Sequence, residues 1–152
     1  MRHIFSKDVK LVAGQTSPED LLTTADYPAS GSYIEVAGHE WVNVVIHLGA
    51  INAGDTPTFK LQQATATNGT LATIDTVNCK KVAAHTDDDQ ALMMFLETSQ
   101  LTATYHYISV DVSAVSNASY GDILFFLGGA RHKPVTQATA LVPTDNQFIK
   151  AG

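Results

Sequence analysis

Apolar and polar residues alternate along most of the central part of the chain. Between positions 41 and 50 every second residue is apolar, which is the period of a β-strand with one buried face. The apolar side of this expected strand consists of Val42, Val44, Ile46, Leu48 and Ala50. Similar short runs lie at 33–36, 58–64, 71–75, 79–84, 91–97, 104–112, 122–127 and 134–138, and turn residues separate most of them. This pattern predicts an all-β fold, an antiparallel, jelly-roll-like β-sandwich of roughly eight short strands.

Two of these runs are apolar at successive positions rather than at alternate ones. They are residues 91–96 (ALMMFL) and 123–127 (ILFFL). One face of an antiparallel sheet normally contacts water, so a strand that is apolar on both faces is expected to be covered on its outer side as well. The cover could be the N-terminal arm, the C-terminal tail or another subunit.

The first 31 residues differ in pattern from those that follow. Residues 17–20 (SPED) combine a capping Ser, a Pro at the first helical position and acidic residues in the first turn, which predicts a helix start. Only Leu21 and Leu22 follow as apolar residues, so we expect no more than a turn or two of helix. Residues 28–31 (PASG) are typical of a linker. The predicted organisation is an N-terminal arm at 1–31, a β-sandwich domain at 32–138 and a C-terminal tail at 139–152.

The dipeptide Asn68-Gly69 lies between two of the expected strands. Asn-Gly is the preferred pair of a type I′ turn, in which both central residues have positive φ. We therefore predict a β-hairpin here, and a ligand-binding loop is the alternative.

Composition limits the classes of partner. The chain has 152 residues and a formal net charge of −6, which argues against nucleic-acid binding because that requires a surplus of Lys and Arg. The N-terminal residues lack the apolar core of a signal peptide, and no run is long enough to span a membrane. Cys79 is the only cysteine, so an intrachain disulfide is excluded. These observations predict a protein made in the cytosol that binds neither nucleic acid nor membrane.

Candidate catalytic and metal-binding patterns are weak. No two of the six histidines are two positions apart, as a His-x-His metal motif on a strand would require. The acidic run at 87–89 lacks the alternation of a calcium loop, and a turn explains it better. There is no G-x-S-x-G nucleophile motif, and the Gly128-Gly129 pair opens no helix that would bind phosphate. We expect no catalytic residues, no metal, no cofactor and no enzymatic activity.

A carbohydrate-binding module is the main rival among binding functions. Such sandwiches present aromatic side chains on an exposed face, and Trp41, Tyr105 and Tyr107 are the candidates. Packing in the core explains their spacing equally well.

Four segments together resemble a family. They are VNVVIHLGAINAGDTPTFKLQQATATNGT, KKVAAHTDDDQALMMFLETSQL, TYHYISVDVS and LGGARHKPVTQ, which span roughly residues 33–137. In this order they resemble small structural proteins of tailed-phage gene clusters, which look like head decoration or minor virion proteins built on a β-sandwich. The first 31 residues have no counterpart in the resemblance.

The resemblance implies a capsid decoration (cement) protein that bridges major capsid subunits and stabilises the assembled head of a tailed bacteriophage. The expected partners are the major capsid protein and further copies of the chain, with a trimer favoured, and the expected location is the virion surface. A tail or neck component is the alternative placement. The candidate contact segments are 1–16 and 134–152, and the candidate contact residues are Arg131, Lys133, Phe5 and Val9.

Overall fold

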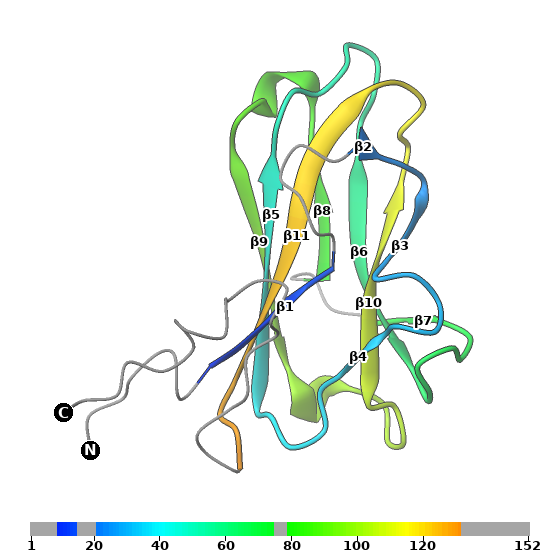
Figure 1. The fold of residues 1–152 in the computed structure, drawn as a ribbon, viewed down its shortest axis with the longest axis vertical. Helices are drawn as coiled ribbons and strands as arrows, with labels where there is room; N and C mark the ends of the chain where they lie inside the picture. Colours follow the sequence, from blue (N-terminus) through cyan, green and yellow to red (C-terminus); the bar gives the residue numbers. More distant parts are fainter. Residues whose placement is uncertain (1–8, 15–20, 75–78, 132–152) are drawn as a thin grey trace, which may run out of the picture.

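In a computed structural model, which describes residues 9–14, 21–74 and 79–131, the chain forms two antiparallel β-sheets packed face to face (Figure 1). The first sheet has the order β1-β11-β5-β9, and β2 also pairs with β11. Its strands are β1 (Lys10–Ala13), β2 (Leu21–Leu22), β5 (Trp41–Leu48), β9 (Ala91–Glu97) and β11 (Ser119–Gly128). The predicted all-β sandwich is therefore confirmed.

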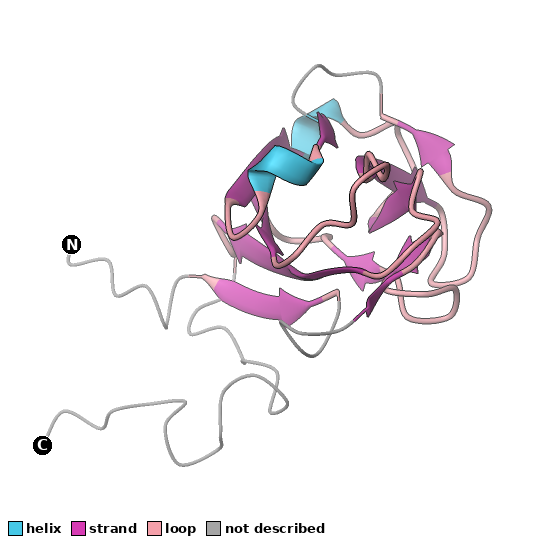
Figure 2. Cartoon of the chain, turned by 90° about the horizontal axis from the view of Figure 1, so that it is seen from above, coloured by secondary structure: helices cyan, strands magenta, loops and turns pink. Residues whose placement is uncertain are grey.

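The second sheet has the order β3-β10-β6-β7, with β4 on β10 and β8 on β6. Its strands are β3 (Ala25–Tyr27), β4 (Ile34–Glu35), β6 (Thr58–Ala64), β7 (Ala72–Thr73), β8 (Lys80–Val82) and β10 (Tyr107–Ser113). Two 3-10 helices, η2 (His85–Asp87) and η3 (Thr98–Gln100), lie at the two ends of β9. Seen from above, both are on the same side of the sandwich (Figure 2). No helix in the described ranges is long and apolar enough to cross a membrane.

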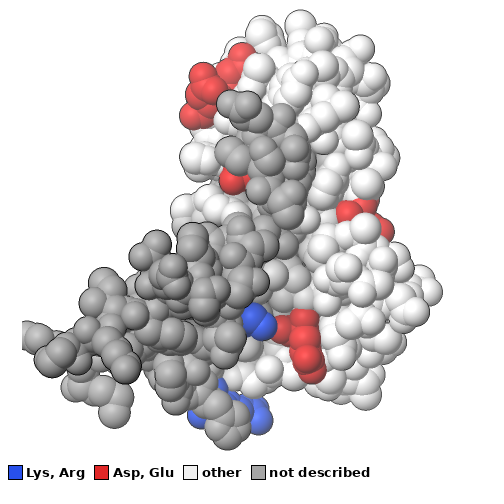
Figure 3. Space-filling model, in the orientation of Figure 1, with Lys and Arg blue, Asp and Glu red and all other residues white. Residues whose placement is uncertain are grey.

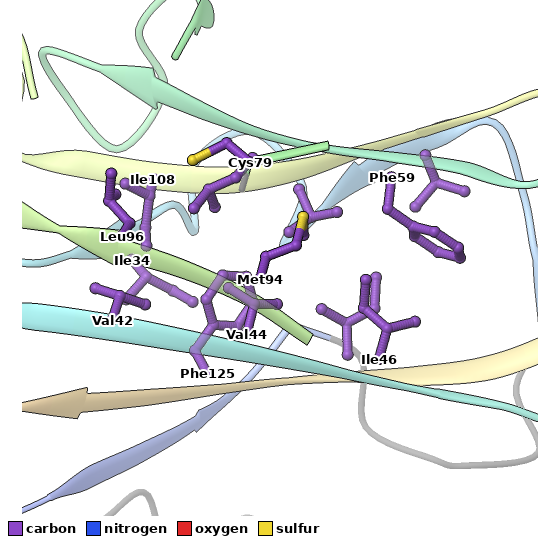
Figure 4. Close-up of a cluster of buried hydrophobic side chains, with 14 of the residues drawn as sticks. Ile34, Val42, Val44, Ile46, Phe59, Cys79, Met94, Leu96, Ile108 and Phe125 are labelled. Carbon is purple, nitrogen blue, oxygen red and sulfur yellow. The ribbon is translucent and has the colours of Figure 1, made fainter. Parts of the chain in front are cut away.

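Alternation along the strands produces the core between the sheets. In β5 the apolar positions 42, 44, 46 and 48 are all buried, as the sequence predicts, whereas Ala50 lies beyond the strand end and is exposed. In Figure 4 side chains of the first sheet such as Val44 and Phe125 point toward Phe59 and Ile108 of the second. All four are completely buried. Burial of this continuous apolar layer is the main stabilising contribution to the fold.

Part of the segment predicted as an arm belongs to the two sheets. β1 pairs with β11 over four residues, and β3 pairs with β10. The helical turn expected at Leu21 and Leu22 is wrong: these residues form β2, and Leu22 is 1% exposed in the core. The predicted helix start at 17–20 lies outside the described residues. The strands β1, β2 and β3 have two to four residues and lie in no longer alternating run, and the sequence pattern therefore did not predict them.

The predicted hairpin forms, but its turn differs from the expectation. β6 and β7 pair antiparallel, with Gln63 opposite Ala72. Neither Asn68 nor Gly69 has a positive φ, so the turn is not type I′. A longer loop joins the strands instead, and the backbone N–H of Gly31 donates to the carbonyl of Thr67 in it at 2.8 Å. Hydrogen bonds between this loop and residues distant in sequence, Gly31 and Tyr33, therefore stabilise its conformation.

Candidate interaction surface and cleft

The outer side of the first sheet carries a largely apolar surface. The strand registers align Met93, Val45 and Leu124 in one row across β9, β5 and β11, and in the next row Asn43 of β5 separates Phe95 of β9 from Phe126 of β11, which lies opposite Leu11 of β1. We call this surface the apolar face, and it comprises Leu11, Val45, Met93, Phe95, Leu124 and Phe126. Met93 is 59% exposed and Phe95 is 41% exposed, and the other four are half-buried. The two strands predicted to be apolar on both sides, now β9 and β11, supply most of this face.

The outer side of the second sheet is charged instead. Its registers align Asp26, Asp111, Lys60 and Lys80 in one row across four strands. Burial raises the pKa of Asp26, and the neighbouring charge of Asp111 raises it further, while a hydrogen bond with Tyr33 opposes the shift. Figure 3 shows that charged side chains gather in a few separate patches of the visible surface. The two outer sides of the sandwich therefore differ in chemistry, and only the first has the apolar character of a docking surface.

The apolar face ends at an edge strand, because β9 is the last strand of the first sheet. The backbone N–H of Leu48 donates to the carbonyl of Gln90, and that of Thr98 donates to the carbonyl of Glu40. In an antiparallel pair the residues that bond to the neighbour alternate with those that do not. The N–H and C=O groups of Met93 and Phe95 consequently point away from β5. An edge with both open backbone groups and exposed apolar side chains favours pairing with another chain.

A cleft of about 710 Å³ lies at the end of the sandwich where β5 begins. The loop at 36–40 forms one wall, and η3 and Arg131, three positions after the end of β11, contribute the others. This loop is fastened on two sides. The backbone N–H of Arg131 donates to the carbonyl of Gly38 at 2.9 Å, and Oγ1 of Thr98 donates to the carbonyl of His39 at 2.7 Å. The walls of the cleft are thus held by hydrogen bonds between segments distant in sequence.

Trp41, the only tryptophan of the chain, lines this cleft and packs on Gly128 of the neighbouring strand. A Cβ at position 128 would lie 1.9, 2.2 and 2.5 Å from three carbons of the indole ring. Only glycine leaves room for the ring at this distance from the backbone. The orientation of the indole is consequently fixed by β11.

Polar side chains with free hydrogen-bonding capacity surround this ring. Glu40, Glu97 and Arg131 line the cleft and are exposed. Within the described residues, neither the Glu40 carboxylate nor the Arg131 guanidinium has an ion-pair partner. Both ring nitrogens of His39 are buried there and make no well-formed hydrogen bond within the described residues. Burial lowers the pKa of His39 and the positive charge of Lys10 lowers it further, while hydrogen bonding with the backbone of Ala37 and Val36 opposes the shift, so the neutral imidazole is favoured.

A different polar cluster closes the opposite end of the sandwich. Asp55 is 3% exposed, and its carboxylate accepts hydrogen bonds from the backbone N–H and hydroxyl of Ser116, from the backbone and amide of Asn117, and from the hydroxyl of Ser119. Burial raises the pKa of Asp55, but these bonds outweigh it and hold the pKa well below its ordinary value. The cluster joins the loop after β5 to the loop before β11. From the sequence these residues are only turn residues between expected strands, because no pattern in the sequence pairs residue 55 with residues 116–119.

Of the acidic run predicted as a turn at 87–89, Asp87 ends the 3-10 helix η2 and Asp88 and Asp89 form the turn that follows. Asp87 accepts a hydrogen bond from the backbone N–H of Ala84, and Asp88 accepts one from the backbone N–H of Ile51 at 2.8 Å. Within the described ranges no group of three or more His, Cys, Asp or Glu side chains is arranged to hold a metal ion.

The candidate residues from the sequence are dispersed. Arg131 is exposed at the rim of the cleft, whereas Val9 is 6% exposed and lies in the interior. Phe5 and Lys133 lie outside the described residues, as do the segments 1–8 and 132–152. Of the three aromatic candidates for sugar binding, Trp41 lines the cleft, but Tyr105 and Tyr107 do not. Phe95 takes their place, and a single strand pattern could not reveal this because Phe95 comes from another strand.

No protein-family model matches the sequence, and no curated protein and no solved structure matches the chain.

Proposed function

We propose that this chain is a structural assembly protein, a capsid decoration (cement) protein of a tailed bacteriophage that associates with copies of itself and binds the assembled head. The observation that carries the proposal is the apolar face. The resemblance of residues 33–137 to small virion proteins supports the same assignment. A protein that binds only the assembled shell stabilises it by mass action, and many copies acting together allow each contact to be weak.

A second copy of the chain is the proposed occupant of the apolar face. The chain carries a net charge of −6, so two copies repel each other over most orientations. The six residues of the apolar face carry no charge, and contact there avoids this repulsion. The open edge of β9 continues this surface, because Met93 and Phe95 present both their side chains and their backbone groups to an approaching copy. Closed homo-oligomers are built from such self-complementary or ring-forming contacts, and a trimer remains the favoured form.

Light scattering over a range of concentrations tests self-association. The variant Met93→Glu places a charge in the apolar face at a position exposed enough to leave the fold intact, and we expect association to weaken at least tenfold because the carboxylate must be desolvated. Val82→Glu is the matched control, because Val82 is 55% exposed on β8 of the other sheet. It should leave the measured mass unchanged. A wild-type chain that stays monomeric at every concentration would contradict the proposal that the apolar face is an interface between copies.

The virion assignment has a separate test. Mass spectrometry of tailed-phage particles purified from the source of the gene should detect this chain together with the major capsid protein. Detection in tail fractions alone would favour the tail or neck placement instead, and absence from the particles would reject the proposal.

A further inference from the structure

The cleft at the start of β5 combines an aromatic surface with unpaired polar groups. Trp41 and Phe95 provide the rings, and Phe95 is 41% exposed. The contact with Gly128 holds the indole in place before any ligand arrives, so binding requires little ordering of this side chain. A volume of about 710 Å³ lies in the range of sites that bind small ligands.

The polar groups select the chemistry of the ligand. Glu40 and Glu97 accept hydrogen bonds, whereas Arg131 donates them in a planar fork. An anionic ligand would meet two carboxylates, and a cationic ligand would meet the guanidinium. A neutral ligand with several hydroxyl groups satisfies donors and acceptors together, because each hydroxyl can donate and accept.

His39 also lines the cleft, but its two ring nitrogens are buried and closed to a ligand. The backbone groups of Val36 and Ala37 act on the imidazole by hydrogen bonding. The imidazole therefore contributes to the wall of the cleft, and the exposed charged groups that can bind a ligand are Glu40, Glu97 and Arg131.

We propose that this cleft binds a neutral saccharide, with one face of the sugar ring on the aromatic side chains of Trp41 and Phe95 and its hydroxyl groups on Glu40, Glu97 and Arg131. Pyranose rings suit such a site because their C–H groups gather on one face and pack on aromatic rings, while their hydroxyls point outward. Phe95 belongs to both this cleft and the apolar face, so saccharide binding and self-association share one side chain and are measured separately, by titration and by light scattering. Saccharide binding would allow a particle that carries the chain to adhere to glycans on a surface.

The experiment is a screen of the full chain on an array of neutral and anionic oligosaccharides, followed by titration of each hit. Emission of Trp41 reports binding at the cleft directly, because no other tryptophan contributes. We expect a neutral oligosaccharide to shift this emission saturably. Glu40→Gln and Arg131→Met should each weaken its binding about tenfold or more, as expected for loss of a charged hydrogen bond.

Glu35→Gln is the matched control. Glu35 is an exposed carboxylate on β4 that does not line the cleft, and its replacement should change binding less than twofold. Circular dichroism confirms that each variant is folded. The proposal is overturned if the folded wild-type chain binds no neutral oligosaccharide, if anionic glycans bind in preference, or if Glu40→Gln and Arg131→Met bind as well as Glu35→Gln.

Discussion

Replacement of Gly128 by Ala tests whether the indole of Trp41 lies on the backbone of β11. The added Cβ would be 1.9 Å from the nearest ring carbon. Carbon atoms in favourable contact are about 3.5 Å apart, so the ring has to move by about 1.5 Å or rotate away from the strand. Because β5 is paired with β11 along the whole length of β5, the backbone cannot supply this movement at low energetic cost. We expect the ring to leave its position.

The cost follows from the area that the ring loses. A tryptophan side chain buries about 150–250 Å² in a protein, and we assume that rotation exposes about 100 Å² of it. At about 25 cal/mol per Å² this amounts to about 2.5 kcal/mol. Replacing a glycine within a strand recovers about 0.5 kcal/mol through backbone entropy. The free energy of unfolding should therefore fall by about 2 kcal/mol.

Urea unfolding followed by circular dichroism measures this change, and the emission of Trp41 should move to longer wavelength as the ring becomes exposed. A double-mutant cycle with Trp41→Val isolates the contact. In the Trp41→Val background Gly128→Ala should cost almost nothing, since no ring occupies the space above position 128. A loss below about 0.5 kcal/mol in the wild-type background, which is the ordinary range for surface substitutions, together with unchanged emission, would show that the packing argument is wrong.

Two further predictions concern the opposite end of the sandwich and the N-terminal strands. The Asp55 carboxylate has a pKa near 3.8 in the unfolded chain and a lower one in the fold, so it should stabilise the fold fully above pH 3.8 and lose this contribution as the pH falls. The variant Asp55→Asn should therefore be less stable at pH 7. Its urea midpoints at pH 7 and pH 3 should differ less than those of Asp89→Asn, a control at an exposed position. In the same assay Leu22→Ala should lower the free energy of unfolding by about 2–5 kcal/mol, because the Leu22 side chain is buried. Leu21→Ala should lower it far less, because Leu21 is 48% exposed. Equal losses for the two variants would contradict the placement of β2.

The strands that the sequence predicts most clearly are those with long alternation. All eight runs predicted between residues 33 and 127 correspond to strands β4–β11, and β5 matches residue by residue in its buried positions. The run predicted at 134–138 lies outside the described residues. Alternation was informative here because each of these strands has one side in the same apolar layer. The strands β1, β2 and β3 were not predicted because two to four residues give no period, whereas the equally short β4, β7 and β8 lie within the longer predicted runs at 33–36, 71–75 and 79–84.

The candidate sites were less predictable for a physical reason. The apolar face depends on the register of four strands, and the sequence indicates only that β9 and β11 are apolar on both sides. The cleft joins residues 36–41, 95–101, 106 and 131, which come together only after both sheets have formed. Asp55 and its hydrogen-bond donors at 116–119 are likewise distant in sequence. Neither their spacing nor their residue types indicate that they are in contact.

The position of β11 in the first sheet constrains how the protein is made. β11 lies between β1 and β5, so the strand synthesised last among those described pairs with one of the first. A nascent chain that has reached residue 118 still lacks the strand that joins β1 to β5. Until translation supplies residues 119–128, one backbone edge of β5 is unpaired and the core lacks Ile123, Phe125 and Leu127. Productive folding therefore follows completion of β11, and a ribosome that stalls before this point would release an aggregation-prone fragment.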